Sequence, residues 1–445
     1  MPIKNIDALL SSFSGELHDA RRDALEILAE AVEGSDAYRV TLSAVHVDDG
    51  ILHAGDKKFE LDDFGNIYVI GFGKAGTGMA RAVGEILPVK RGAVIAPGGG
   101  AEAGRGDMVS GTIKVFYGSH PLPSEENLAA TDRLLDIVKG ARKNDLVIVL
   151  ISGGGSALLC KPRISLEGMT EITDRLMRAG CTIEELNTVR KHLSYVKGGR
   201  LALESRAHML SLIISDVMGN PVEFIASGPT SPDTTTYRDA ARVLEKYGLR
   251  GAVREVDDAI DAGIEGRTDE TPEHLDNVTN VIIADNGTAC RAAAEAASGR
   301  GYHQKIVSTS VSGEARDAGR DIARYSKLFP RDRAVLIFGG ETTVTVTGGG
   351  EGGRNQELVL GAIREIEDER IVIVSCGTDG IDGNSDAAGA VGDGTSIRRA
   401  EAAGMDAESY LENNDSYHFF KKLNDLIITG RTGTNVMDIQ IIIKY

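Results

Sequence analysis

Residues 145–160 read D-L-V-I-V-L-I-S-G-G-G-S-A-L-L-C, and this segment organises the rest of the chain. Its apolar run, residues 146–151, shows no polar alternation, which predicts a strand buried on both faces of a parallel sheet. The glycine-rich turn that follows leads into an apolar segment that predicts a helix. Such a turn presents backbone N–H groups beside the positive end of a helix dipole, as a phosphate requires, although similar turns also occur without a ligand. The candidate phosphate loop comprises Ser152, Gly153, Gly154, Gly155 and Ser156.

The composition predicts a globular protein of two domains. The chain has 445 residues, 42% of them hydrophobic and 26% charged, and this length exceeds what a single core usually supports. The formal net charge of −17 argues against a nucleic-acid-binding protein. Four cysteines without a C-x-x-C pair fit a reducing compartment. Because no signal peptide or membrane-length apolar run is found, we expect a cytoplasmic protein that does not bind a membrane.

The order of predicted elements gives the domain boundaries. A surface helix is expected over residues 17–32, and a series of alternating strands and helices then continues to residue 253. Between residues 254 and 280 acidic residues, Gly and Pro accumulate, which predicts a connection between the domains or a helix packed loosely outside one of them. A second α/β series fills residues 281–445. Its last strand, at 439–443, could return to the sheet of the first domain.

The loop G-F-G-K-A-G at residues 71–76 follows a predicted strand and satisfies G-x-G-x-x-G. A dinucleotide site also needs an acidic residue about 20 positions later, and the next strand ends at Pro97 without one. Lys74 inside the loop suits a phosphate or carboxylate. Three interpretations stay open on this motif alone: a dinucleotide site, an anion site that uses Lys74, and a structural turn with a solvated lysine.

Polar residues follow several other strands of the first domain, where open α/β sheets bind their ligands. His120 lies in the rigid loop G-S-H-P-L-P, and as a lone histidine it fits either substrate binding or a structural hydrogen bond. Asp216, with Asn220 nearby, is a candidate Mg²⁺ or ribose contact or a turn-forming residue. A basic segment could line an anion site, although we expect at least two of its four cations to be solvated: Arg190, Lys191, Lys197 and Arg200.

The second series repeats this pattern. Glu341 follows a strand predicted at 334–338, Arg354 opens a helix after a glycine-rich turn, and Asp379 follows a strand predicted at 371–375. The last strand is preceded by T-G-T-N-V-M-D, which contains Asn435. The chain has no G-x-x-x-x-G-K-[ST] motif and no evident G-x-S-x-G triad, which excludes P-loop enzymes and argues against α/β-hydrolases.

Taken in order, these motifs resemble the glycerate 2-kinase family, the MOFRL-type glycerate kinases. The strings G-F-G-K-A-G, G-S-H-P-L-P, L-I-S-G-G-G-S-A-L-L, I-S-D-V-M-G-N-P, F-G-G-E-T-T-V-T-V, G-G-R-N-Q-E, G-T-D-G-I-D-G and T-G-T-N-V-M-D carry the resemblance from about residue 17 to the C-terminus. It implies two α/β domains, a larger Rossmann-like one with a mostly parallel sheet and a smaller C-terminal one, with the active site in the cleft between them. It also implies ATP- and Mg²⁺-dependent phosphorylation of D-glycerate at the 2-hydroxyl, with Mg²⁺ replaceable by another divalent cation.

The resemblance implies these active-site residues: Lys74, Glu341, Arg354, Asp379 and Asn435. Gly153 to Ser156 match the family's phosphate-binding loop. Lys74 and Arg354 would supply positive charge during phosphoryl transfer, and Asp379 would orient or deprotonate the glycerate hydroxyl. Glu341 and Asn435 would hold substrate or metal, and His120 would contact substrate. The family's older association with hydroxypyruvate reductase gives an NAD(P)-dependent reductase as the alternative function. A homodimer is compatible with the sequence.

Overall fold

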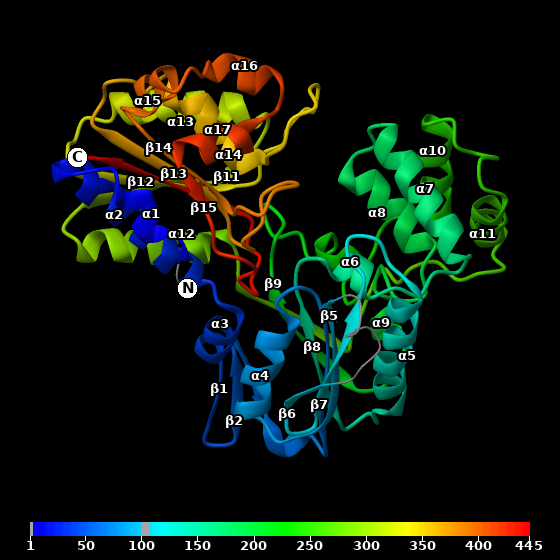
Figure 1. The fold of residues 1–445 in the computed structure, drawn as a ribbon. Helices are drawn as coiled ribbons and strands as arrows, with labels where there is room; N and C mark the ends of the chain where they lie inside the picture. Colours follow the sequence, from blue (N-terminus) through cyan, green and yellow to red (C-terminus); the bar gives the residue numbers. More distant parts are fainter. Residues whose placement is uncertain (1–2, 99–106) are drawn as a thin grey trace. The chain divides into compact units, whose positions relative to one another are not determined.

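The computed structural model describes residues 3–98 and 107–445, which form two compact units. The central unit comprises Ala37–Ile283, and the C-terminal unit comprises Ala284–Tyr445 together with Met1–Asp36. Figure 1 shows the second grouping directly, because the dark-blue helices α1 (Ile6–Leu10) and α2 (Gly15–Gly34) lie with the orange and red elements. Each unit is an α/β structure with its own sheet and its own apolar core.

The central unit is built on a seven-stranded sheet of order β10-β9-β8-β4-β5-β7-β6. The pairs β9–β8, β8–β4, β4–β5 and β5–β7 are parallel, and only β6 is antiparallel to its neighbour among the pairings described. The strands are β4 (Ile67–Phe72), β5 (Val89–Pro97), β6 (Asp107–Ser110), β7 (Ile113–Gly118), β8 (Leu146–Ile151), β9 (His208–Ile214) and β10 (Val278–Ala284). Every residue of β8 is buried, which confirms the predicted central strand.

The register places the candidate loops at one edge of this sheet. Ile151 of β8 is opposite Phe72 of β4 and Ile213 of β9, and Phe72 is opposite Ile95 of β5. Because these strands are parallel and in register, the residues that follow them leave the sheet at the same level. The Lys74 loop, the Ser152–Ser156 loop and the Asp216 turn therefore share the carboxyl edge.

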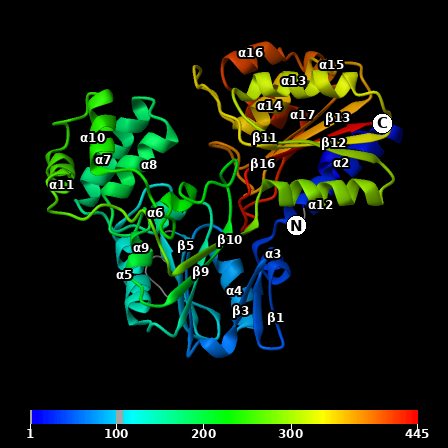
Figure 2. The same cartoon turned by 180° about the vertical axis from the view of Figure 1, so that it is seen from behind.

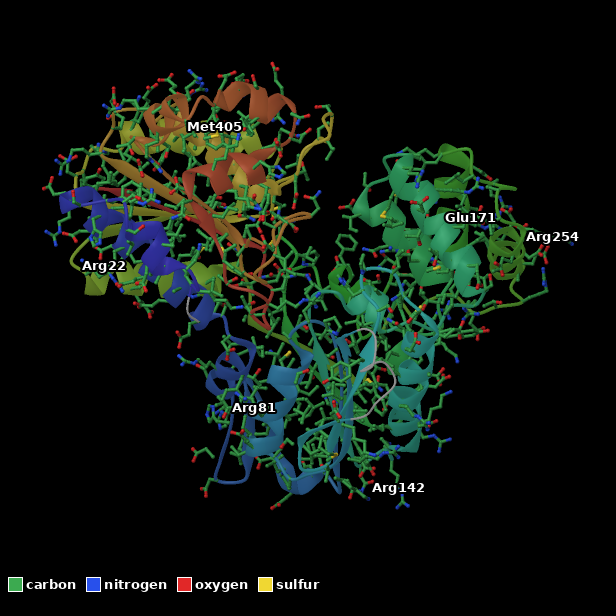
Figure 3. The ribbon with its side chains drawn as sticks, viewed as in Figure 1. Arg22, Arg81, Arg142, Glu171, Arg254 and Met405 are labelled. Carbon is green, nitrogen blue, oxygen red and sulfur yellow. The ribbon has the colours of Figure 1, made fainter. Side chains whose placement is uncertain are left out.

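Helices cover both faces of the central sheet, and a further group of helices lies beside it. The helix α5 (Glu125–Gly140) packs on the face formed by Ile70, Val147 and Val149, and α4 (Gly76–Ile86) contacts the same strands from the other face. The helical cluster consists of α7 (Leu166–Arg178), α8 (Ile183–His192), α10 (Tyr237–Lys246) and α11 (Arg254–Ile264), around a separate apolar core. Figure 3 labels Glu171 on α7 and Arg254 at the start of α11 within it. The short helices α6 (Gly155–Leu158) and α9 (Arg200–Leu203) connect to this cluster.

A small antiparallel sheet precedes the main one. It contains β1 (Val45–Asp48), β2 (Ile51–Ala54) and β3 (Lys57–Glu60), and α3 (Ala37–Ala44) leads into it. Leu52 and Ala54 of β2 are buried, while the strand β3 is largely exposed. This sheet carries none of the predicted site residues.

The C-terminal unit contains a six-stranded mixed sheet of order β11-β12-β16-β13-β14-β15. Its strands are β11 (His303–Val311), β12 (Ala334–Gly340), β13 (Ile371–Gly377), β14 (Gly389–Asp393), β15 (Leu426–Ile427) and β16 (Asp438–Lys444). The helices α2 and α12 (Asn286–Gly299) cover one face. The other face carries α13 (Ala315–Leu328), α14 (Arg354–Ile363), α15 (Ser396–Ala402), α16 (Ala407–Glu412) and α17 (Ser416–Leu423), as the two opposite views show (Figures 1 and 2).

The predicted start of the second series at residue 281 lies close to the boundary of the units between Ile283 and Ala284, whereas the predicted end of the first domain at residue 253 lies within the central unit. Residues 254–264 form α11 and pack into the helical cluster, so the change in composition there marks an amphipathic helix. The predicted surface helix at 17–32 belongs to the C-terminal unit, where α2 buries Leu25, Leu28 and even Arg21. The last strand does not return to the first sheet, because β16 pairs with β12 and β13.

Within the two described ranges, none of the helices combines the length and the apolar composition needed to cross a lipid bilayer.

Candidate active site

The glycine loop after β8 adopts a backbone that only glycine accommodates easily. Gly154 has φ 81° and precedes α6, and the nearby Gly73 has φ 125°. A Cβ on Gly73 would clash with Ser152 Oγ, so the β4 and β8 loops are in direct contact. Two hydrogen bonds join them: Lys74 N donates to Gly153 O at 2.8 Å, and Ala75 N donates to Ser152 Oγ at 3.0 Å. The two predicted anion loops therefore form one structure.

Lys74 and His120 lie against the middle of this loop. A Cβ built on Gly154 would be 3.0 Å from His120 Cδ2 and 3.6 Å from Lys74 Cγ. Lys74 is half-buried and His120 is exposed. The structure thus brings together three predicted site residues that are as far apart as 80 positions in sequence. It places the His120 imidazole and the Lys74 side chain beside a glycine, which has no side chain of its own.

Three of the four cations in the basic segment are buried and bound within the protein, so our expectation that at least two are solvated is wrong. Lys191 pairs with the buried Asp233 at 3.2 Å. Arg200 donates to Asp269 O at 2.8 Å and to Tyr237 Oη at 3.3 Å. These cations stabilise the helical cluster, because a buried charge needs a partner.

Lys197 and Arg190 are the two cations of this segment nearest the glycine loop. Lys197 Nζ donates to Ser156 O at 2.6 Å and to Leu159 O at 2.9 Å, which satisfies carbonyls at the end of α6. Burial lowers the pKa of Lys197 to about 8. Arg190 is half-buried, and burial lowers its pKa as well. Among the described residues, no carboxylate lies within ion-pair distance of Arg190.

A cavity of about 240 Å³ begins at Gly154 and extends toward the helical cluster. Its walls come from the proline loop after β7, from α6, from α7 and from α8. Pro121, Leu122 and Met169 are among its apolar lining residues, and Arg190 is its half-buried cation. His120 and Ser156 also line it, so the cavity opens directly onto the candidate phosphate loop.

Asp216 and Asn220 lie in the turn after β9. Asp216 is half-buried, and Asn220 has φ 57° with its N–H donating to Val217 O at 3.1 Å. This turn shares the sheet edge with the glycine loop, because β9 and β8 are adjacent. Across the described part of the chain, no three His, Cys, Asp or Glu side chains gather closely enough to hold a metal ion by themselves.

In the C-terminal unit, Arg354 occupies the first position of α14 and is held between two carboxylates. Its Nε and Nη2 donate to the two oxygens of Asp438 at 2.5 and 2.9 Å, and Nη1 lies 2.5 Å from Glu341 Oε1. Asp438 is buried, whereas the Arg354 side chain is 33% exposed. Burial opposes the charge of Arg354, but the two ion pairs outweigh it and raise its pKa above the ordinary value. The guanidinium is therefore fixed, charged and accessible.

Asp379 and Asn435 lie around the same point. A Cβ on Gly377 would be 3.4 Å from Asp379 Oδ1 and 3.6 Å from Asp438 Oδ1, so these carboxylates are close neighbours. Burial raises the pKa of Asp438, with the negative charge of Asp379 adding to that rise and Arg354 opposing it. Asn435 Oδ1 accepts from Met437 N at 3.3 Å, in the loop that enters β16. The C-terminal unit thus groups Arg354, Glu341 and Asp379 with Asp438, and Asn435 lies in the loop that leads to Asp438.

Asp382 fixes the first turn of α14, the helix that Arg354 begins. Its Oδ1 accepts from Asn355 N at 3.0 Å, and its Oδ2 accepts from Gln356 N at 2.9 Å, so it satisfies free N–H groups at the start of α14. Asp382 is 1% exposed. Burial raises its pKa to about 6, although the hydrogen bonds to α14 oppose this shift.

The sequence did not identify Asp438 and Asp382 as site residues. It also did not distinguish Arg190, which lines the cavity, from the other cations of the basic segment. The motifs T-G-T-N-V-M-D and G-T-D-G-I-D-G each contained the relevant acid. Both acids are buried, however, and their partner is the first turn of α14, which lies far away in sequence. A local pattern does not reveal such a pairing.

Comparisons with known proteins match two separate segments of the chain. Residues 23–265 match a domain of unknown function, DUF4147, and residues 334–438 match the MOFRL family. A glycerate 2-kinase from Pyrococcus horikoshii is 44% identical over 438 residues, covering 96% of this chain and 97% of its own. A D-glycerate 2-kinase from Thermotoga maritima is 42% identical over 394 residues, covering 86% and 91%. The crystal structure of a glycerate kinase from Thermotoga maritima has a TM-score of 0.82 at 38% identity, covering 95% of this chain and 99% of that one.

Proposed function

The chain belongs to the MOFRL-type glycerate kinase family, and we propose that it transfers the γ-phosphoryl group of ATP to the 2-hydroxyl of D-glycerate. The products are 2-phosphoglycerate and ADP. The observation that carries the proposal is the fixed guanidinium of Arg354, held by Asp438 and Glu341 yet accessible. Phosphoryl transfer requires positioning and positive charge from the protein far more than covalent chemistry.

The central unit is proposed to bind the nucleotide phosphates. Support comes from the glycine loop, where the partly exposed Gly154 has a left-handed backbone and no side chain, and from the adjacent side chain of Lys74. Gly153 and Gly155 are proposed to keep the backbone close to the phosphates. The Ser152 hydroxyl accepts a hydrogen bond from Ala75 N and so fixes the β4 loop against the glycine loop. The Ser156 hydroxyl lies 2.9 Å from the Ser227 hydroxyl, which fixes the far end of the glycine loop. His120 is proposed to contact the substrate, because its imidazole lies at the same glycine.

The C-terminal unit is proposed to supply the groups that act on the reacting hydroxyl. Asp379 would orient the 2-hydroxyl of glycerate and accept its proton as the oxygen attacks the γ-phosphorus. Its neighbour Asp438 is buried and uses both of its oxygens on Arg354, which makes Asp438 unsuited to this role. Glu341 and Asn435 are proposed to hold the substrate, with Glu341 also fixing the orientation of Arg354.

Mg²⁺ is proposed as the metal, and the residues present fit it. Mg²⁺ commonly takes one or two carboxylates and completes its shell with phosphate oxygens and water. A half-buried carboxylate at the edge that carries the phosphate loop meets this need, and Asp216 occupies that place, with Asn220 in the same turn. When bound, the ion neutralises charge on the phosphates. A cytoplasmic location is also proposed, supported by the four free cysteines.

The test is an ATP-dependent assay on D-glycerate with the position of the new phosphate assigned by ³¹P and ¹H NMR. We expect 2-phosphoglycerate and stoichiometric ADP, with activity lost on chelation of divalent cations and restored by Mg²⁺. The alternative is NAD(P)H-dependent reduction of hydroxypyruvate, measured in parallel. NADH oxidation without glycerate phosphorylation by the wild type would overturn the kinase proposal.

A further inference from the structure

The cavity between the proline loop and the helical cluster extends well beyond the glycine loop that is proposed to hold the phosphates. One end is formed by Gly154 and His120, and the other by α7 and α8. All of its lining residues belong to the central unit. If a molecule binds its phosphates on the glycine loop, the organic group attached to those phosphates can therefore occupy this cavity.

The lining indicates what that attachment is. Pro121, Leu122, Pro123, Ala157 and Met169 form extended apolar walls. Glycerate carries an oxygen on every carbon, so these walls would give it nothing to bind and would strip water from its polar groups. A purine base has two flat apolar faces and a polar edge, which matches apolar walls with a few polar groups among them.

The polar groups in the cavity are concentrated on the helical side. Thr170 and Thr173 of α7 line it, and Arg190 of α8 is half-buried there. Lys197 also lines the cavity, but its ammonium group is engaged by the carbonyls of Ser156 and Leu159. Within residues 3–98 and 107–445, Arg190 makes no ion pair with a carboxylate. A half-buried guanidinium without an acidic partner can stack on a base or donate to its ring nitrogens and to ribose oxygens.

We propose that this cavity binds the adenosine part of the nucleotide and that Arg190 contacts its base or ribose. This inference rests on the proposed function in that the phosphates are placed on the glycine loop. It adds a residue and a pocket that the motifs do not contain. The structure separates the two halves of the nucleotide site: Lys74 and Gly154 for the phosphates, and Arg190 and Leu122 for the nucleoside.

Two variants test the proposal without depending on catalysis. Arg190→Ala removes the guanidinium, and Leu122→Asn makes one apolar wall polar at a side chain that is 55% exposed, where the fold does not depend on it. Arg238→Ala is the matched control, because Arg238 is an exposed arginine of α10 in the same helical cluster and does not line the cavity. Thermal melting of each variant reports whether the fold is kept.

The probes are ADP, followed by calorimetric titration, and inorganic tripolyphosphate, followed as a competitor of ADP. We expect Arg190→Ala to weaken ADP binding about tenfold or more and Leu122→Asn about fivefold. Tripolyphosphate, which has no nucleoside, should bind both variants within twofold of the wild type. In the kinase assay the KM for ATP should rise in parallel while the KM for glycerate changes by less than twofold. Arg238→Ala should match the wild type throughout.

Three results would overturn the inference. ADP and tripolyphosphate weakening equally would make Arg190 a phosphate ligand. A raised KM for glycerate with unchanged ADP binding would make the cavity a carboxylate site. Unchanged binding of every probe by folded variants would leave the cavity outside the reaction. If the predicted ADP and tripolyphosphate results are obtained with a wild type that does not phosphorylate glycerate, the inference holds and the proposed function fails.

Discussion

At the scale of single residues, Gly154 has a left-handed backbone and also lies in the candidate phosphate loop. We expect Gly154→Ala to raise the KM for ATP by about tenfold or more. The new methyl group would press on the His120 ring at 3.0 Å and enter the space above Lys74. Gly180→Ala is the control, because Gly180 has a similar φ of 75° but its new methyl group would meet nothing within 4 Å. Both variants should lose about 1–2 kcal/mol of stability from the left-handed backbone. Equal KM values for the two variants would contradict the phosphate-loop assignment.

Arg354 tests whether geometry or charge alone is required. We expect Arg354→Ala and Lys74→Ala each to lower kcat by roughly 10²–10³, the usual cost of losing one group that stabilises the transition state. Arg354→Lys should recover only part of the activity, because an ammonium group cannot bind both oxygens of Asp438 and also reach Glu341. Steady-state kinetics at saturating ATP provide the measurement. Arg316→Lys is the control, since Arg316 pairs with the buried Glu357 and not with Asp438 or Glu341. Full activity in Arg354→Lys would show that only the charge matters.

Asp382 should make the stability of the protein depend on pH. Its pKa of about 6 in the folded state exceeds its ordinary value of 3.8, so the folded state holds this proton more tightly than the unfolded state does. The stability it contributes is fully present below about pH 4 and is lost as the pH rises through about 6, by about 3 kcal/mol. Asp382→Asn removes this titration. The difference in unfolding free energy between wild type and variant, from urea denaturation at pH 4.5 to 7, should therefore shift against the wild type as the pH rises. A difference that does not vary with pH would contradict the assignment.

At the scale of elements, the helix α2 shows how far the sequence predicts the fold. Its apolar spacing predicted the helix over residues 17–32 but placed it at the surface. In the structure Arg21 is fully buried, with its guanidinium bonded to Asp393 and to Asp425 and stacked 3.9 Å from the Phe13 ring. A charged residue within the buried face weakens the amphipathic pattern, and its partners are more than 370 positions away.

That ion-pair group gives a direct test of the assignment of α2 to the C-terminal unit. We expect Arg21→Met to lower the free energy of unfolding by about 3 kcal/mol, because two buried carboxylates lose a shared cation. Arg399, 2.7 Å from Asp425, keeps the loss at the lower end of the range. Arg22→Met is the control: Arg22 is 44% exposed and pairs with the exposed Asp19, so its loss should be below about 0.5 kcal/mol. Figure 3 labels Arg22 on this helix. Equal effects of the two substitutions would contradict the buried network.

The strands were predicted more accurately than their arrangement. The runs at 146–151, 334–338, 371–375 and 439–443 correspond to β8, β12, β13 and β16, because short, largely apolar runs report burial on both faces of a sheet. The insertion of β16 between β12 and β13 could not be predicted, since pairing over about 60 to 110 residues leaves no local pattern. The site shows the same limit. Lys74 and Arg354 lie in recognisable motifs. The roles of Asp438 and Arg190 depend on which helices pack beside them, and a local pattern does not show this.

At the scale of the whole molecule, the candidate site residues are divided between the two units. The candidate phosphate loop, Lys74, His120, Asp216 and the cavity belong to the central unit, and the other predicted catalytic residues belong to the C-terminal unit. The central unit is a single continuous segment, whereas the C-terminal unit is assembled from both ends of the chain. The family match at residues 334–438 covers only part of the second unit, because α2 and β11 lie outside the matched residues.

The continuity of the central unit leads to a prediction about binding without catalysis. A fragment of residues 36–284 contains the complete seven-stranded sheet and both of its apolar clusters, so we expect it to fold with a cooperative thermal transition. It should bind ADP within about tenfold of the affinity of the full chain, because every proposed nucleotide contact lies within it, and Lys74→Ala should weaken that binding. It should not phosphorylate glycerate, since Arg354 and Asp379 are absent.

Residues 284–445 alone should fail to fold, because the sheet loses α2 and the carboxylates of Asp393 and Asp425 lose Arg21. Calorimetry and circular dichroism on the two fragments provide the measurement. A folded central fragment that does not bind ADP, alongside a full chain that does, would show that the nucleotide site requires the other unit.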